Sequence, residues 1–122
     1  MPTKILLIDD EKDILEAVSD ELQAEGYLVL TASNGPEGLE ITNRERPDLI
    51  FLDVMMPKMD GWRVLRTLKE DEATRKIPVV MLSGKAETGF LLESQRLQAS
   101  DYLIKPFELG KLLASIRKYA WS

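Results

Sequence analysis

Three acidic residues stand together near the start of the chain, in the segment KILLIDDE. Asp9, Asp10 and Glu11 directly follow four apolar residues, a pattern that predicts a buried strand. Carboxylates this close repel one another, and partial burial strengthens the repulsion. One interpretation is a solvated turn in which Asp10 or Glu11 caps the next helix. The other is that a bound cation neutralises the acids.

Three further side chains that could take part in chemistry follow other apolar runs. These are Asp53, Ser83 and Lys105. A carboxylate nucleophile, a hydroxyl and an ammonium, together with a metal ion, are suited to bind and transfer a phosphoryl group. Hard oxygen ligands that leave room for water and phosphate favour Mg²⁺ over a transition metal. This chemistry requires a fold that brings the groups together.

The elements that must position these groups are visible as apolar runs. The runs are nearly continuous rather than alternating, which is typical of strands covered on both faces. Amphipathic stretches predict helices between them, and Asp60 is expected to cap a helix whose buried side includes Trp62. The helix near 87–97 has the weakest pattern, because Thr88 and Gly89 are poor helix formers. The five expected strands are 5–8, 27–30, 49–52, 79–82 and 102–104.

The repeated alternation of strand and helix predicts an α/β fold. We expect a five-stranded parallel sheet with helices on both faces, a doubly wound, flavodoxin-like arrangement. In the strand order 2-1-3-4-5, the order reverses between the first and third strands, and ligands bind beyond the carboxyl ends of the strands there. Asp9, Asp10 and Asp53 would converge at that point. This convergence favours a divalent cation over a solvated turn.

Length and composition narrow the function further. With 122 residues, we expect one domain spanning 1–122. The chain has no histidine, which removes Ser-His hydrolysis and imidazole metal ligation, and no cysteine, which suits the cytoplasm. The net charge of -5 disfavours direct nucleic-acid binding. No apolar stretch is long enough for membrane insertion, and the start has no signal-peptide core.

Four segments in order, LLIDDE, LIFLDVMMPKMDGW, VVMLSG and DYLIKPF, resemble the receiver domain of two-component response regulators, including its chemotaxis-regulator-like members. The resemblance covers essentially the whole chain. It implies that Asp53 accepts a phosphoryl group from a phosphohistidine on a sensor histidine kinase or a histidine phosphotransfer protein. It also implies that Asp10, Asp53 and the backbone carbonyl of Met55 bind Mg²⁺ directly, while Asp9 acts mainly through water.

The resemblance assigns roles to the later segments as well. Ser83 and Lys105 are expected to contact the phosphoryl oxygens, and the bond between Lys105 and Pro106 is expected to be cis. Ser83 and Tyr102 would form the conformational switch. An output partner is expected on the face made by the fourth helix, fifth strand and fifth helix, where exposed members of 90–92 would form a docking patch. The domain would catalyse its own phosphotransfer and slow autodephosphorylation, as a signalling switch rather than a conventional enzyme.

Slow autodephosphorylation also follows from two side chains expected at the mouth of the site. Met55 is apolar and cannot orient water strongly, and Lys85 donates hydrogen bonds but cannot accept a proton. Neither residue is suited to act as a general base for hydrolysis of an aspartyl phosphate. We therefore expect a persistent phosphoryl group.

Three other functions are compatible with parts of the pattern. A flavodoxin-like cofactor binder would need a Ser, Thr or Gly-rich cradle after the first strand, where this chain has DDE. A phosphatase with an aspartyl-phosphate intermediate would have a second Asp in place of Met55. A phosphorylation-independent, receiver-like interaction module would have lost a site residue, and none is lost. The chain departs from the family pattern at Gly84 and in LQASDY, near the fourth helix.

Overall fold

The structure, a computed structural model, describes residues 2–84 and 90–120, and the side chains of 90–92 lie outside this description. Five parallel strands form one sheet in the order β2-β1-β3-β4-β5. The predicted fold class and strand order are confirmed. The strands are β1 (Lys4–Ile8), β2 (Leu28–Ala32), β3 (Leu49–Asp53), β4 (Val79–Ser83) and β5 (Asp101–Ile104).

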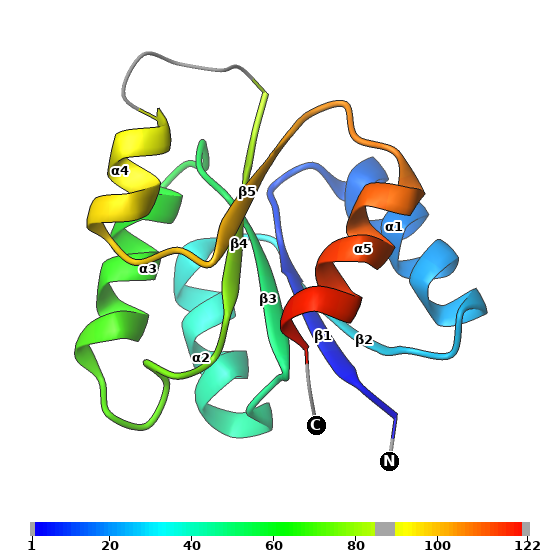
Figure 1. Cartoon of the computed structure of the whole chain (residues 1–122). Helices are drawn as coiled ribbons and strands as arrows, with labels where there is room; N and C mark the ends of the chain where they lie inside the picture. Colours follow the sequence, from blue (N-terminus) through cyan, green and yellow to red (C-terminus); the bar gives the residue numbers. More distant parts are fainter. Residues whose placement is uncertain (1, 85–89, 121–122) are drawn as a thin grey trace.

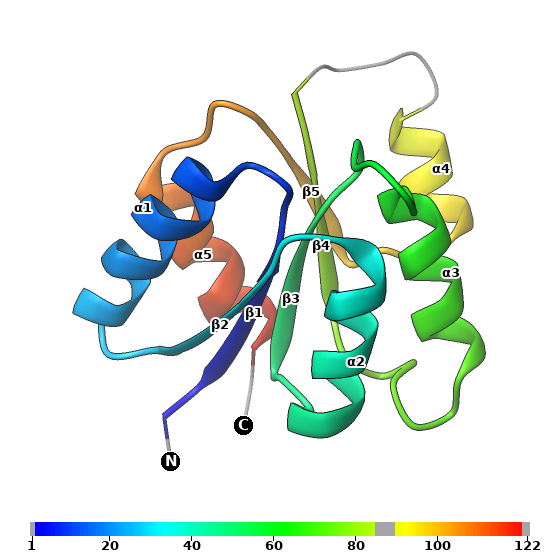
Figure 2. The same ribbon diagram turned by 180° about the vertical axis from the view of Figure 1, so that it is seen from behind.

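Helices cover both faces of the sheet, as Figures 1 and 2 show from opposite sides. One face carries the first and last helices, and the other carries the three helices between them. The helices are α1 (Lys12–Ala24), α2 (Gly35–Glu45), α3 (Gly61–Glu70), α4 (Phe90–Arg96) and α5 (Leu109–Tyr119). The fourth helix was expected near 87–97, and residues 87–89 lie outside the described residues.

Two apolar cores, one on each face of the sheet, hold the layers together. Along β1, Leu6 and Ile8 point into the core under α2 and α3, whereas Ile5 and Leu7 point into the core under α1 and α5. This alternation follows from the two-residue period of a strand. The central strands β3 and β4 are fully buried, but β2 and β5 are only partly buried because they form the edges of the sheet. The prediction that all five strands are covered on both faces was therefore wrong for the two edges.

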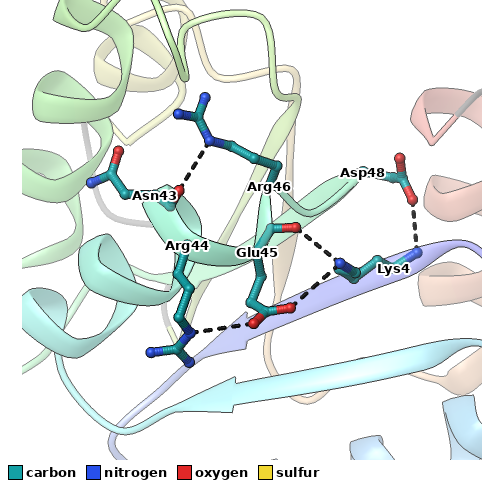
Figure 3. Close-up of polar contacts among 6 residues, drawn as sticks. All are labelled: Lys4, Asn43, Arg44, Glu45, Arg46 and Asp48. Atoms are coloured by element: carbon teal, nitrogen blue, oxygen red, sulfur yellow. Dashed lines mark hydrogen bonds and ion pairs between the residues drawn. The ribbon is translucent and has the colours of Figure 1, made fainter.

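A polar cluster fixes the amino-terminal ends of the strands, opposite the acidic end of the sheet (Figure 3). The backbone N–H of Lys4 donates to Asp48 Oδ2 over 2.8 Å. The Lys4 ammonium donates to the backbone carbonyl of Glu45 over 3.0 Å and lies 3.5 Å from Glu45 Oε1. These contacts tie the start of β1 to the end of α2 and the start of β3. They support the register in which Ile8 lies beside Leu52.

The connection from β3 to α3 is compact. Asp60 caps α3 as predicted, because its Oδ1 accepts a hydrogen bond from the Arg63 backbone N–H over 3.0 Å. The Gly61 N–H donates to the Val54 carbonyl over 2.8 Å, and a Cβ at Gly61 would collide with the backbone carbonyl of Asp53. Only glycine lets the helix start this close to the end of β3. The half-buried Trp62 packs against the core, as expected.

Candidate functional site

The strand register carries the predicted site residues to one end of the sheet. Ile8 lies beside Leu52, so the next residues along the two strands, Asp9 and Asp53, arrive at the same level. Asp53 lies beside Leu82, so Ser83 is one residue further along its strand than Asp53. Ser83 lies beside Ile104, so Lys105 is again one residue further along than Ser83. The carboxyl ends of β1, β3, β4 and β5 thus meet where the sequence pattern predicts.

The three predicted acidic residues converge. Asp9, Asp10 and Asp53 each offer a carboxylate oxygen, and these oxygens lie within 4.8 Å of one another. Asp9 and Asp53 are buried, whereas Asp10 is exposed. Two buried carboxylates and an exposed one form a site that is anionic yet open to a ligand.

Lys105 lies among these carboxylates. Its Nζ is 2.7 Å from Asp9 Oδ2, 3.3 Å from Glu11 Oε1 and 3.4 Å from Asp53 Oδ1. Burial opposes the charged ammonium, but the hydrogen bond and charge of Asp9, followed by the charge of Asp53, raise the pKa of Lys105 above its usual value. The chain thus supplies one neutralising cation itself. The peptide bond from Lys105 to Pro106 is cis, as expected.

Asp53 is electrostatically perturbed. Burial and then the charge of Asp9 raise its pKa from 3.8 to about 7; a hydrogen bond that the protonated Asp53 carboxyl donates to Asp10 acts in the same direction, and Lys105 acts against it. The pKa of Asp53 stays above its usual value because Lys105 alone does not offset desolvation and a neighbouring anion. An added cation would favour ionised Asp53. Perturbed carboxylates of this kind are common at functional sites.

The remaining predicted residues surround this cluster. Ser83 is buried at the end of β4, and Tyr102 on β5 packs partly buried against the core under α2 and α3. The Met55 side chain is 65% exposed, which fits the expected position at the mouth of the site. Lys85 lies outside the described residues, as do the side chains of 90–92 proposed as a docking patch.

Sequence reasoning missed the contact made by Glu11. This residue stands at the N-cap of α1, but its side chain makes no capping hydrogen bond, which goes against the alternative interpretation in which Glu11 caps the helix. Its carboxylate contacts Lys105, and its backbone N–H donates to Asp9 Oδ1 over 2.9 Å. The only sequence signal was its place beside the acidic pair, which did not distinguish it from a turn residue.

The fold and the acidic site define a class of protein, and comparisons with known proteins identify it. Residues 5–117 match the response regulator receiver domain. The chain belongs to this family, whose domains accept a phosphoryl group, generally use Mg²⁺, and interact with histidine kinases or phosphotransfer proteins.

Individual relatives agree with this membership. The response regulator PleD of Caulobacter vibrioides is 42% identical over 117 residues, covering 96% of this chain and 26% of PleD. The DNA-binding dual master transcriptional regulator RpaA of Synechocystis is 40% identical over 114 residues, covering 93% of this chain and 47% of RpaA. The chain therefore spans about a quarter to a half of the length of these curated relatives.

A solved structure of similar size gives the same fold. The chemotaxis protein CheY4 of Vibrio cholerae superposes with a TM-score of 0.92 at 31% identity, covering 98% of this chain and 99% of that chain. None of the described helices combines the length and apolar character needed to cross a membrane.

Proposed function

We propose that Asp53 accepts a phosphoryl group from a phosphohistidine on a sensor histidine kinase or histidine phosphotransfer protein, and that the domain signals by changing conformation. One observation carries the proposal: oxygens of Asp9, Asp10 and Asp53 lie within 4.8 Å of one another, with the Lys105 ammonium 3.4 Å from Asp53. A buried carboxylate beside two others and a cation is suited to phosphoryl transfer.

The donor set fits Mg²⁺. Carboxylate oxygens of Asp9, Asp10 and Asp53 lie within 4.8 Å of one another and are the hard ligands that Mg²⁺ prefers; Asp10 and Asp53 would hold it directly and Asp9 through water. Among the described residues, no backbone hydrogen bond ends on the Met55 carbonyl, which leaves that oxygen available as a third protein ligand. When bound, Mg²⁺ would offset the negative charge of the acids and of the phosphoryl oxygens.

In the proposed transfer, an ionised Asp53 oxygen forms a bond to phosphorus as the bond from phosphorus to the donor imidazole nitrogen breaks. The electron pair of the broken bond stays on that nitrogen, and because the other ring nitrogen of the donor carries a proton, the ring leaves as neutral imidazole. Lys105 and Ser83 would hold the phosphoryl oxygens, the first through charge and the second through its hydroxyl. Neither residue gains or loses a proton in this step.

The conformational output would begin at Ser83. If Ser83 turns toward the phosphoryl group, space opens beside β4, and the half-buried Tyr102 on the neighbouring β5 can move inward. We propose that an output partner reads this change on the face made by α4, β5 and α5.

The proposal also covers the extent of the domain, its location in the cell and its mode of action. Residues 1–122 would form one receiver domain, supported by a single sheet with a core on each face. The domain would work in the cytoplasm, where histidine kinases present their phosphohistidine. It would act as a switch that catalyses its own phosphorylation and slow dephosphorylation.

The proposed function is tested by incubating the protein with a small phosphodonor, such as phosphoramidate, and measuring its intact mass. We expect one phosphoryl group on the wild type with Mg²⁺, and none with a chelator or on Asp53→Asn. Phosphorylation of Asp53→Asn to the same extent would refute the assignment of Asp53. A folded wild type that gains no phosphoryl group would favour the phosphorylation-independent interaction module.

A further inference from the structure

We propose that Glu11 is a positioning residue that holds the Lys105 ammonium before phosphorylation, and that Lys105 exchanges Glu11 for a phosphoryl oxygen on Asp53. This inference rests on the proposed function of Asp53 and adds a residue with no assigned role. It predicts that Glu11 competes with the phosphoryl group for Lys105.

The hydrogen-bonding capacity of Lys105 is the first observation. A lysine ammonium has three N–H donors and no acceptor. Three carboxylates surround it, at 2.7 Å (Asp9), 3.3 Å (Glu11) and 3.4 Å (Asp53). Asp9 and Glu11 each accept a hydrogen bond from the ammonium, whereas Asp53 is held as an ion pair. A phosphoryl group on Asp53 would draw the ammonium toward its oxygens, and the hydrogen bonds that hold the ammonium back are those to Asp9 and Glu11.

The contact to Glu11 is the easiest to give up. The Asp9 side chain is only 2% exposed and makes the shortest contact, so leaving it would strand a buried charge. The Glu11 side chain is 58% exposed and can return to water with little desolvation cost. The contact to Asp53 changes during the reaction itself, because the accepting oxygen becomes part of the phosphoryl linkage. Glu11 is the partner that leaves.

The surroundings of Glu11 give it room to move. The residue occupies the N-cap of α1 without a capping side-chain bond, so its release breaks no helix cap. Its backbone stays fixed through the hydrogen bond to Asp9 Oδ1. The pair of Glu11 and Lys105 borders a cavity of about 520 Å³ between α1 and the segment after β5, whose lining also includes Glu21 and Phe107. The carboxylate can swing into this space without displacing the core.

The size of the effect follows from the exposure of the pair. An ion pair with one exposed partner contributes modestly, so removing Glu11 should tighten binding of a phosphoryl group by about threefold and not by orders of magnitude. The gain should shrink at high ionic strength, because salt screens the exposed carboxylate.

The test uses beryllofluoride with Mg²⁺ as the phosphoryl mimic, with the dissociation constant measured by calorimetry. Glu11→Gln removes the charge, and Glu11→Asp keeps it on a side chain one methylene shorter. Glu21→Gln is the matched control, because Glu21 lines the same cavity but makes no ion pair among the described residues. We expect about threefold tighter binding for both Glu11 variants and no change for Glu21→Gln, with all three proteins melting as cooperatively as the wild type.

The outcomes separate the inference from the proposed function. If the wild type binds the mimic and Glu11→Gln binds it equally or more weakly, the exchange is refuted while the role of Asp53 stands. If Glu21→Gln gains as much as Glu11→Gln, or Glu11→Asp matches the wild type, long-range charge and not the contact with Lys105 explains the effect, and the exchange is refuted. If the folded wild type binds no mimic, the proposed function fails and the exchange fails with it.

Discussion

Replacing Asp53 by Asn should stabilise the metal-free protein at neutral and alkaline pH. Burial and the Asp9 charge raise the pKa of Asp53 from 3.8 to about 7, so the folded chain holds a proton that the unfolded chain has already released. Between these two pH values, the free energy of unfolding falls by about 1.4 kcal/mol per pH unit. Below pH 3.8 both states are protonated and the penalty disappears. The raised pKa of Asp53 therefore lowers the free energy of unfolding by about 4 kcal/mol at pH 8 and by about 1 kcal/mol at pH 4.5.

The assay is urea unfolding in chelator across this pH range. Asp53→Asn should exceed the wild type in free energy of unfolding by up to about 4 kcal/mol at pH 8, and the gain should shrink toward pH 4.5. Asp20→Asn is the control, because it removes an exposed carboxylate of α1 and should change little. Added Mg²⁺ should stabilise the wild type but not Asp53→Asn. A variant less stable than the wild type at pH 8, or a gain that does not vary with pH, would refute this reasoning.

Three further predictions address the loop, the switch and the lifetime of the signal. Gly61→Ala should lower the free energy of unfolding by about 2 kcal/mol or more, because its Cβ would collide with the Asp53 carbonyl. Gly110→Ala on α5, whose Cβ would meet no atom within 4 Å, should raise it by about 0.5–1 kcal/mol, and equal effects of the two variants in urea titrations would contradict this view. Beryllofluoride should change hydrogen exchange in β5, around Tyr102, but not in β2 at the other edge, and Ser83→Ala should abolish the change; unaltered exchange in β5 would reject the route. Met55→Asn should speed the first-order decay of phosphorylated protein severalfold because an amide can orient water; wild-type decay within seconds, or slower decay of the variant, would count against it.

Much of the fold was predictable because its signals are local. Apolar runs predict strands, and Asp60 followed by Gly61 predicts the start of a helix. Each of these signals lies in a few consecutive residues. The parallel order of the strands then brings Asp9 and Asp53 to one edge, since both follow central strands directly. A predicted topology was therefore enough to predict that the acidic residues converge.

The contacts of Lys105 were less predictable, because they depend on distances between side chains far apart in the sequence. Glu11 and Lys105 are separated by 94 positions, and nothing near Glu11 indicates whether its carboxylate caps α1 or reaches across the sheet. The partial exposure of β2 and β5 was missed for a related reason. An edge strand and a central strand can have the same apolar run, and only the complete sheet distinguishes them.

The most direct test of the central claim is to locate the phosphoryl group. Protein phosphorylated by phosphoramidate and Mg²⁺ is reduced with borohydride, which converts an aspartyl phosphate to homoserine, and is then digested and sequenced by tandem mass spectrometry. The proposed function predicts homoserine at position 53 and aspartate at positions 9 and 10. Homoserine at position 9 or 10, with intact Asp53, would contradict it.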